Sequence, residues 1–409
     1  MERAELARRL WQTIPGAAGA APAFDAPGGV LIVEERDPAR FMAAFARAVS
    51  SPGLVFLADP AWGPAERSDL AALTALAPEG GEGGAGWLMV PSGGTGGRLK
   101  FARHDGATIE AAVRGFCTHF QAPAVNSVGL LPLHHVSGLM AWMRSALSGG
   151  TCLPWEWKRI ESGDYPARPP GRCFISLVPT QLQRLLGRPE AAGWLAGFDT
   201  VFVGGGPVWP ELANAAARAG IPVSLGYGMT ETAAMVTALH PREFQAGNRS
   251  SGAAMPHAEI KITGDGLVQI FGESVFRGYY PDFSSQRSLI TADLGSLDSS
   301  GHLHISGRKD SVIITGGKKV DPQEVEAALM ASGEFSDVAV LGVPDPEWGE
   351  AVVACYPAAG DPPDADRITS QLSSLASFKR PRRFIPIRDW PRNDQWKLNR
   401  AALLAIVRA

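Results

Sequence analysis

Short apolar runs alternate with amphipathic segments through the first part of the chain. Residues 30–33 and 53–58 are apolar runs whose length predicts buried strands. Residues 37–49 between them, and residues 1–13 before them, repeat apolar side chains at the spacing of a helix. Because strands that alternate with helices form layered sheets, this pattern predicts an α/β fold.

The alternation continues toward residue 310. The pattern predicts further strands at residues 87–90, 127–133, 175–178 and 200–203, a strand and turn over residues 268–280, and helices at residues 105–120 and 179–186. We therefore expect residues 1–309 to form one large, multi-layer α/β domain.

The character of the chain changes at residue 310, where shorter elements follow one another. The pattern predicts strands at residues 311–315, 338–343 and 383–387, helices at residues 323–330 and 367–376, and a glycine turn at Gly316 and Gly317. Asp321 and Pro322 have the residue types of a helix N-cap and first turn. We expect residues 310–409 to form a small α+β domain.

Composition excludes several classes of protein. The 409 residues suffice for two or three domains, and 45% apolar with 19% charged residues is typical of a globular protein rather than a disordered one. A net charge of -3 gives no basic footprint for nucleic acid. No apolar run approaches the roughly 18 residues of a membrane span, and the first residues lack a signal-peptide pattern. Four cysteines without C-x-x-C spacing favour reduced thiols and a cytoplasmic location.

A glycine-rich loop at residues 92–100 follows the strand predicted at 87–90. Its glycines allow the backbone to approach a ligand closely, and successive N–H groups in such a turn bind phosphate oxygens. Lys100 ends the loop and could neutralise a polyphosphate. A flexible surface loop is the alternative. The sequence matches neither a P-loop nor a dinucleotide-binding motif, because Phe101 follows the lysine and the G-x-G-x-x-G spacing is absent.

Two other segments combine chemistry-bearing residues with strand ends. His134 and His135 could bind a metal, but no third His, Asp or Glu lies nearby in the sequence, so we favour an imidazole that faces a ligand. Three glycines follow the strand predicted at residues 200–203. They either let a flat ring stack on the backbone or simply form a tight turn.

These segments, taken in chain order, resemble the motifs of the adenylate-forming superfamily, the acyl-CoA synthetases and their relatives. The loop at residues 92–100 is similar to T-S-G-T-T-G-x-P-K, although Gly93, Gly96 and Leu99 replace Ser, Thr and Pro. Residues 227–231 match Y-G-x-T-E without departure. The resemblance extends from the loop to the C-terminus, and the first ninety residues look shortened relative to the family.

A narrower resemblance comes from two neighbouring segments. Residues 176–182, S-L-V-P-T-Q-L, are similar to a segment of the o-succinylbenzoate-CoA ligases of menaquinone biosynthesis. Residues 132–138 match the family pattern P-L-x-H-x-x-G, which implies that His135 lines the acyl pocket. For a second carboxylate on the acid, the candidate donors are His135, Ser137 and Arg144.

The resemblance implies roles for residues of the larger domain. Tyr227 would stack on adenine, Thr230 would bind the α-phosphate, and Glu231 would bind Mg²⁺, because carboxylate oxygen is the ligand that Mg²⁺ prefers. The phosphates and the adenine would be bound by Ser92, Gly94, Thr95, Gly97, Lys100, Gly204, Gly205 and Gly206.

Motifs near and beyond residue 293 complete the resemblance. Asp293 in T-x-D-x-G and Arg308 in G-R-x-D would contact the ribose, and Asp310 would be the hinge. Lys397 would be the catalytic lysine of the family's T-x-x-G-K-x-x-R, although Asn393 and Trp396 replace the Thr and Gly. Gly316 and Gly317 would flank the pantetheine arm of CoA.

The reaction implied is ATP-dependent formation of an acyl-adenylate and then an acyl-CoA thioester, with Mg²⁺ as cofactor, CoA as co-substrate and 2-succinylbenzoate as the favoured acid. Three alternatives stay open: another aryl- or acyl-CoA ligase, a ligase that loads a carrier protein, and a nucleotide- or acyl-binding protein without turnover. A homodimer is possible.

Overall fold

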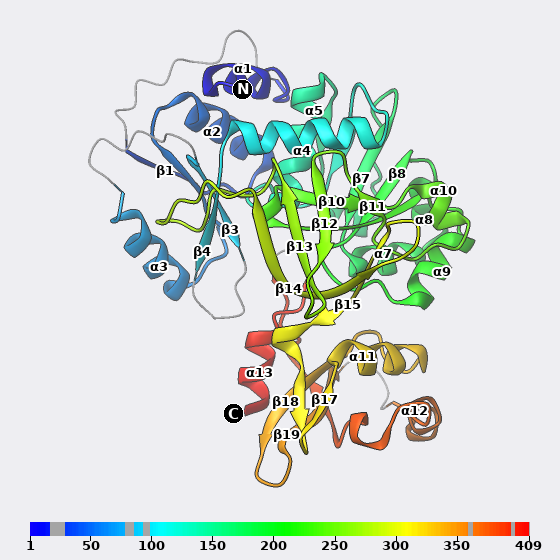
Figure 1. Cartoon of the computed structure of the whole chain (residues 1–409). Helices are drawn as coiled ribbons and strands as arrows, with labels where there is room; N and C mark the ends of the chain where they lie inside the picture. Colours follow the sequence, from blue (N-terminus) through cyan, green and yellow to red (C-terminus); the bar gives the residue numbers. More distant parts are fainter. Residues whose placement is uncertain (17–28, 78–85, 93–98, 359–362, 394–396, 409) are drawn as a thin grey trace.

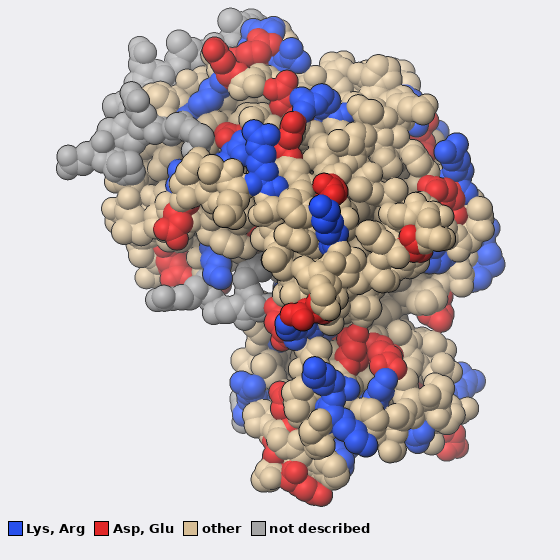
Figure 2. Space-filling model, in the orientation of Figure 1, with Lys and Arg blue, Asp and Glu red and all other residues tan. Residues whose placement is uncertain are grey.

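The computed structural model describes residues 1–16, 29–77, 86–92, 99–358, 363–393 and 397–408. Figure 1 shows a large body of sheets and helices, which carries the N-terminus, and a smaller part that carries the C-terminus. The surface narrows to a waist where the two meet (Figure 2). The predicted fold class is confirmed, whereas the boundary between residues 309 and 310 stays a prediction.

The first sheet has the order β1-β2-β3-β4, with β1 to β3 parallel and β4 antiparallel to β3. Its strands are β1 (Val30–Val33), β2 (Leu54–Leu57), β3 (Leu88–Ser92) and β4 (Lys100–His104), and the helices of this segment are α1 (Arg3–Gln12), α2 (Pro38–Ser50) and α3 (Pro64–Thr74). Asp37 caps α2 by accepting a hydrogen bond from Arg40 N, as its residue type favours.

The second sheet has seven strands in the order β11-β10-β9-β8-β7-β5-β6, and β9, β8, β7, β5 and β6 are parallel. The strands are β5 (Asn126–Gly129), β6 (Cys152–Pro154), β7 (Cys173–Leu177), β8 (Thr200–Val203), β9 (Val223–Met229), β10 (Ala234–Ala238) and β11 (Ala253–Ala254). The helices are α4 (Gly106–His119), α5 (Val136–Ser148), α6 (Trp157–Glu161), α7 (Pro179–Leu186), α8 (Pro189–Ala196), α9 (Pro210–Arg218), α10 (Pro241–Gln245) and the 3₁₀ turn η1 (Thr230–Thr232).

A third, antiparallel sheet has the order β12-β13-β14-β15. It contains β12 (Ala258–Ile262), β13 (Leu267–Gly272), β14 (Ser288–Leu297) and β15 (Leu303–Arg308). Its register places Asp293 directly opposite Arg308, so the two residues predicted to contact ribose are cross-strand neighbours.

The smaller part holds a fourth sheet of order β17-β16-β19-β18, with β20 parallel to β19. Its strands are β16 (Ile313–Thr315), β17 (Lys318–Val320), β18 (Ala339–Asp345), β19 (Gly349–Pro357) and β20 (Arg383–Ile387). Its helices are α11 (Pro322–Ala331), α12 (Ala365–Leu372) and α13 (Arg400–Arg408), with the short turns η2 (Lys309–Ser311) and η3 (Ser377–Lys379).

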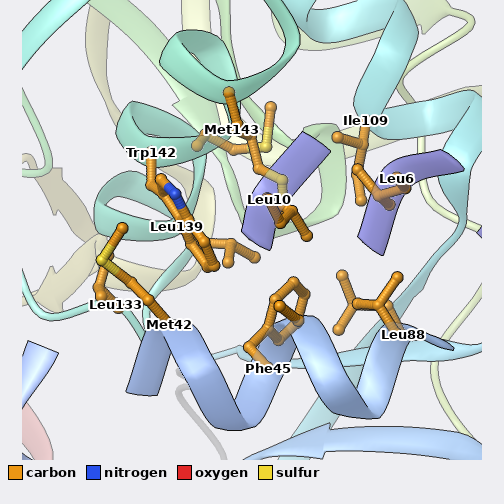
Figure 3. Close-up of a cluster of buried hydrophobic side chains, with 14 of the residues drawn as sticks. Leu6, Leu10, Met42, Phe45, Leu88, Ile109, Leu133, Leu139, Trp142 and Met143 are labelled. Carbon is orange, nitrogen blue, oxygen red and sulfur yellow. The ribbon is translucent and has the colours of Figure 1, made fainter. Parts of the chain in front are cut away.

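The core of the larger body lies where α1, α2 and α5 pack together. Figure 3 shows Leu10, Phe45 and Trp142 from these three helices converging, with Leu88 of β3 beside them. All four side chains are fully buried. Burying an aromatic or aliphatic side chain stabilises a fold by about 1.5–3 kcal/mol, so this cluster fixes α5 against the first sheet.

Three predicted boundaries are wrong, each for a local reason. The strand predicted at residues 127–133 ends at Gly129. Pro132 has no N–H to donate to a neighbouring strand, and its carbonyl accepts a hydrogen bond from His135 N in a turn. The helix predicted at 367–376 begins after its N-cap, Asp364, and ends at Leu372. Ser311 belongs to a 3₁₀ turn rather than to the strand predicted at 311–315.

No helix in the described residues is long and apolar enough to cross a membrane. All four cysteines are free thiols.

Candidate active site

Glu231 lies at the centre of the candidate site, in the turn after β9. Its carboxylate is buried and its Oε1 accepts two hydrogen bonds, from Ser92 Oγ at 2.5 Å and from Tyr279 Oη at 2.7 Å. Burial, followed by the hydrogen bond to this carboxylate, raises the pKa of Tyr279 and keeps its hydroxyl a donor. Two distant segments of the chain, at Ser92 and at Tyr279, therefore hold the carboxylate of a third.

The turn that carries Glu231 is fixed from behind by His104. Its Nε2 donates to Thr230 O at 2.7 Å, and its Nδ1 lies 3.1 Å from Thr108 Oγ1. Burial lowers the pKa of His104, so the ring is neutral. Immediately after the turn, Ala233 and Ala234 have φ values of 51° and 78°, a region that L-residues rarely adopt. Such strain at two successive residues often accompanies a functional site.

The glycine-rich loop begins and ends at the edge of this cluster. Ser92 ends β3 and Lys100 begins β4, and the two are paired in register. Lys100 is exposed, and its Nζ lies 5.6 Å from the centre of the Tyr279 ring. The predicted phosphate-binding residues Gly94, Thr95 and Gly97 lie outside the described residues.

A second cluster joins β9 to the third sheet. Tyr227 Oη donates to Asp293 Oδ2 at 2.6 Å, and Arg308 Nη1 donates to Asp293 Oδ1 at 2.9 Å. The same guanidinium makes two hydrogen bonds to Asp310, at 2.9 and 2.7 Å. Burial, and then the Asp293 carboxylate, raises the pKa of Tyr227. The structure thus brings together the three residues predicted for the nucleoside and the predicted hinge.

The glycine turn after β8 receives the side chain of Lys397. Gly205 has a φ of +79°, and a Cβ there would lie 2.5 Å from Lys397 Cε and 2.6 Å from its Nζ. Gly204 and Gly206 flank it, and β8 pairs with β9, so this turn lies beside the segment that leads to Glu231. Burial lowers the pKa of Lys397. A lysine of the smaller part therefore reaches the larger body at the predicted turn.

Gly316 and Gly317 form the hairpin turn between β16 and β17. Their φ values are +54° and +74°, which glycine adopts readily and which suit a two-residue hairpin. Gly316 N donates to Trp348 O at 2.8 Å, so in this arrangement the turn packs on its own part of the molecule.

A third ligand, an acidic one that the sequence did not offer beside the histidine pair, comes from the segment just after β2. Asp59 lies near His134 and His135, and the candidate ligand atoms of all three are within 4.8 Å of one another. The argument from sequence neighbours was therefore wrong, because Asp59 lies 75 positions before His134 in the chain yet meets it in space.

Arg144 on α5 is buried in an aromatic environment. Its Cζ lies 4.3 Å from the centre of the Phe116 ring, and it lines a small cavity with Phe174, Phe202 and Ser176. Burial lowers its pKa to about 10. In the described part of the chain no carboxylate pairs with this guanidinium, and its Nε has no hydrogen-bond acceptor. Because a buried cation without a counter-ion is costly, Arg144 stays a candidate for binding an anionic ligand group.

The residues that sequence reasoning missed act on Glu231 through side chains. Tyr279 lies in the segment 268–280, for which the sequence predicted only secondary structure, and nothing in the sequence indicated a role for His104. A Tyr next to a glycine turn gives no local indication of a carboxylate 48 positions away in the sequence. Contacts of this kind depend on the fold and not on spacing.

Comparison with known proteins gives a consistent family. The sequence matches the family model of the AMP-binding enzymes over residues 60–280 and that of the AMP-binding enzyme C-terminal domain over residues 324–397. It is 30% identical to an indoleacetate–CoA ligase of Aromatoleum aromaticum over 76% of this chain and 66% of that protein. It is 32% identical to a probable 2-succinylbenzoate–CoA ligase of Mycobacterium tuberculosis, over 78% of this chain and 83% of that one.

The fold agrees with these matches. The structure of an o-succinylbenzoate CoA synthetase from Bacillus subtilis, in complex with its acyl-adenylate intermediate, aligns with a TM-score of 0.75 at 23% identity, over 98% of this chain and 92% of that one. The chain spans about three fifths to two thirds of the length of several of the related ligases. With both family models matched in order and the motif residues gathered around Glu231 and Lys397, the chain belongs to the AMP-binding enzyme family.

Proposed function

We propose that this protein is an AMP-forming acid–CoA ligase and that its acid is 2-succinylbenzoate. The observation that carries the reaction type is the meeting of Lys397 with the glycine turn beside the Glu231 cluster. In this proposal, Lys100, Lys397 and Glu231 would together neutralise the charge of the reactants, as an attack between anions requires.

In the first half-reaction, a carboxylate oxygen of the acid attacks the α-phosphorus of ATP and pyrophosphate leaves. Both reactants are anionic, so the barrier falls when their charge is neutralised and the two are held in line. Lys397 would donate to the reacting oxygens, and Lys100 would hold the leaving phosphates. Thr230 would donate its hydroxyl to the α-phosphate.

Mg²⁺ fits the residues present. Glu231 is a buried carboxylate, and the two hydrogen bonds that it accepts from described residues both reach Oε1, so within that part of the chain Oε2 is available to bind the ion. Oxygen is the donor that Mg²⁺ prefers beside phosphates. When bound, the ion would neutralise phosphate charge, while Ser92 and Tyr279 keep the carboxylate in place.

In the second half-reaction, the CoA thiol attacks the acyl carbon, forms the thioester and releases AMP. This step needs Lys397 withdrawn so that the thiol can approach. We propose that residues 310–409 rotate about Asp310, which would carry Gly316 and Gly317 toward the pantetheine arm. The Arg308–Asp310 hydrogen bonds lie at the pivot of this motion.

Arg144 supports an acid with a second carboxylate. Aromatic rings around the guanidinium suit an aryl group, and Ser176 adds a hydroxyl within the S-L-V-P-T-Q-L segment. The cavity has a volume of about 10 Å³, which is room for one water. A distal carboxylate would reach Arg144 through that water, or directly after the rings shift.

The test is AMP formation that depends on ATP, CoA and acid, across a panel led by 2-succinylbenzoate. Arg144→Met keeps a side chain of similar volume and removes the charge. We expect it to raise the KM for 2-succinylbenzoate by about 10-fold or more and to change the KM for benzoate little. If the wild-type protein prefers a monocarboxylate and Arg144→Met has no effect on the diacid, the substrate proposal is wrong.

The match to an indoleacetate–CoA ligase favours one second candidate, an aryl acid without a distal carboxylate. Indoleacetate in the same panel separates the two acids. A protein without turnover would release no pyrophosphate, and a carrier-loading ligase would acylate a phosphopantetheinyl protein but not CoA. The cytoplasmic location and the homodimer stay predictions.

A further inference from the structure

Asp59, His134 and His135 form a compact group of nitrogen and oxygen donors. His134 and Asp59 are buried, and His135 is partly buried. The two imidazole centres lie 4.4 Å apart with a tilt of 51°, and the Nε2 atoms of both rings are buried. Two imidazoles with one carboxylate are a donor set that binds Zn²⁺ and other first-row divalent ions.

The spacing of His134 and Asp59 suits two ligands of one ion. His134 Nε2 lies 3.6 Å from Asp59 Oδ2, which exceeds the usual hydrogen-bond range of about 2.7–3.2 Å. Ligand atoms about 2.0–2.1 Å from a tetrahedral Zn²⁺ lie about 3.3–3.4 Å from one another. The three donors are within 4.8 Å of one another, so side-chain shifts of about an ångström would complete the geometry.

The backbone around the group is preorganised. Ala61 N donates to Asp59 Oδ1 at 2.7 Å, which orients Oδ2 toward the imidazole. His135 N donates to Pro132 O at 3.2 Å, and His135 precedes α5. A Cβ at Gly138 would lie 2.2 Å from Pro132 O, so the first turn of α5 packs tightly on the histidine turn. Donors that are held before the metal arrives bind it more tightly.

We propose that Asp59, His134 and His135 bind one Zn²⁺ ion. The ion joins the end of β2 to the start of α5, two segments that are distant in sequence. It also fixes the ring of His135, and it leaves a fourth position for water. The site shares no residue with the Glu231 cluster, and its test does not require the proposed reaction.

The test uses Zn²⁺ and Co²⁺ with the full-length protein in the absence of ATP, acid and CoA. Zinc content after dialysis and the visible absorption of tetrahedral Co²⁺ should give one ion per chain, and Zn²⁺ should raise the midpoint of thermal unfolding. Asp59→Asn and His135→Gln keep similar shapes, and each should weaken binding by at least about 10-fold. The circular dichroism of the metal-free variants reports whether they fold.

Two variants serve as matched controls. His304→Asn alters an exposed histidine that lies 3.1 Å from Asp298, and Glu231→Gln alters the proposed Mg²⁺ ligand. Both should bind Zn²⁺ like the wild type. The proposal is overturned if the wild type binds no Zn²⁺ or Co²⁺, if folded Asp59→Asn and His135→Gln bind as tightly as the wild type, or if Glu231→Gln removes the ion.

Discussion

The two lysines proposed to act on the phosphates are held in opposite ways. Lys100 begins a strand of the first sheet, and its exposed ammonium lies 5.6 Å from the centre of the Tyr279 ring. Lys397 comes from a loop before α13 and is partly buried beside Gly205, and removal from solvent lowers its pKa. The first belongs to the body that carries Glu231, and the second is brought there by another part of the molecule.

This difference distinguishes the residues that stay in the site, those around Glu231, from Lys397, which the proposed motion would withdraw. The Glu231 cluster is held by hydrogen bonds within the larger body. Among the described residues, the contacts between the smaller part and that body include the Lys397 side chain at Gly205, Asp321 packed against Gly307, and a hydrogen bond from Gln183 Nε2 to Ser336 O of 3.3 Å. Mutations in the two regions should therefore affect the two half-reactions differently.

The largest effect is expected for Lys397→Ala. Removing a cation from the reacting phosphate should slow ATP–pyrophosphate exchange by about 100-fold or more. CoA transfer from pre-made acyl-adenylate should stay near the wild-type rate, because Lys397 is withdrawn in that step. Lys261→Ala, an exposed lysine on β12, should change neither rate. Equal loss of both half-reactions in Lys397→Ala would contradict the role given to the lysine.

Asp310→Pro tests the motion that withdraws Lys397. Fixing φ at the proposed pivot should slow thioester formation by about 10- to 100-fold, with a smaller effect on adenylation. Single-turnover measurements of each half-reaction report the split. Asp310→Ala is the control, since it breaks the hydrogen bonds with Arg308 but leaves the backbone free to rotate. An unaffected CoA step in Asp310→Pro removes the hinge from the mechanism.

Gly205→Ala tests the contact itself. The new Cβ would occupy the space of the lysine tip, and we expect adenylation to fall by about 10-fold because Lys397 is displaced. Gly220→Ala is the matched control. Gly220 has a similar φ of +68°, but a Cβ there would have no atom within 4 Å. It should cost about 1 kcal/mol of unfolding free energy and leave adenylation intact. The same adenylation rate in both variants would mean that the contact has no role.

Tyr279→Phe tests the Glu231 cluster, which belongs to the larger body. Losing one hydrogen bond to Glu231, worth about 1 kcal/mol, should lower adenylation about 5-fold. Tyr280→Phe is the neighbouring control, because the buried Tyr280 hydroxyl has no hydrogen-bond partner in the part of the chain that the structure describes. Its removal should be neutral or slightly stabilising. A larger loss of activity in Tyr280→Phe than in Tyr279→Phe would reverse this assignment.

The folding stability of the two regions should also depend differently on pH, and this effect is the smallest of those predicted. All eight histidines precede residue 310, and burial lowers the pKa values of His119 and His257 to about 4. Between about pH 6.5 and pH 4 the unfolded chain binds these protons and the folded chain does not, so stability falls as pH falls.

Each of the two histidines contributes at most about 1.4 kcal/mol per pH unit. Urea midpoints at pH 7, 6 and 5 measure the loss, and His119→Gln should make it shallower. A midpoint that rises toward pH 5 would contradict the burial argument.

The sequence predicted the elements that depend on local pattern. The α2 helix after Asp37 and the strand at Arg383–Ile387 follow from capping and hydrophobic period. The spacing of Asp293 and Arg308 was informative because the two residues are register partners in one hairpin. Glu231 was singled out because residues 227–231 resemble the Y-G-x-T-E motif of the family.

The rest depends on contacts between distant segments. Nothing near Ser92 or Tyr279 indicates that both hydroxyls donate to one carboxylate. The group of Asp59 with His134 forms only because β2 and the start of α5 meet. The strand β19 and the helix α13 were not predicted, although β19 pairs with β16, β18 and β20.

The two alanines that follow the Thr230–Thr232 turn have a consequence for thermostability engineering. Each holds a left-handed backbone that costs about 1–2 kcal/mol, and glycine at either position would relax it. A screen for heat resistance would therefore favour Ala233→Gly or Ala234→Gly. The gain would come with a looser Glu231, so the most heat-resistant variants from such a screen should be slower catalysts.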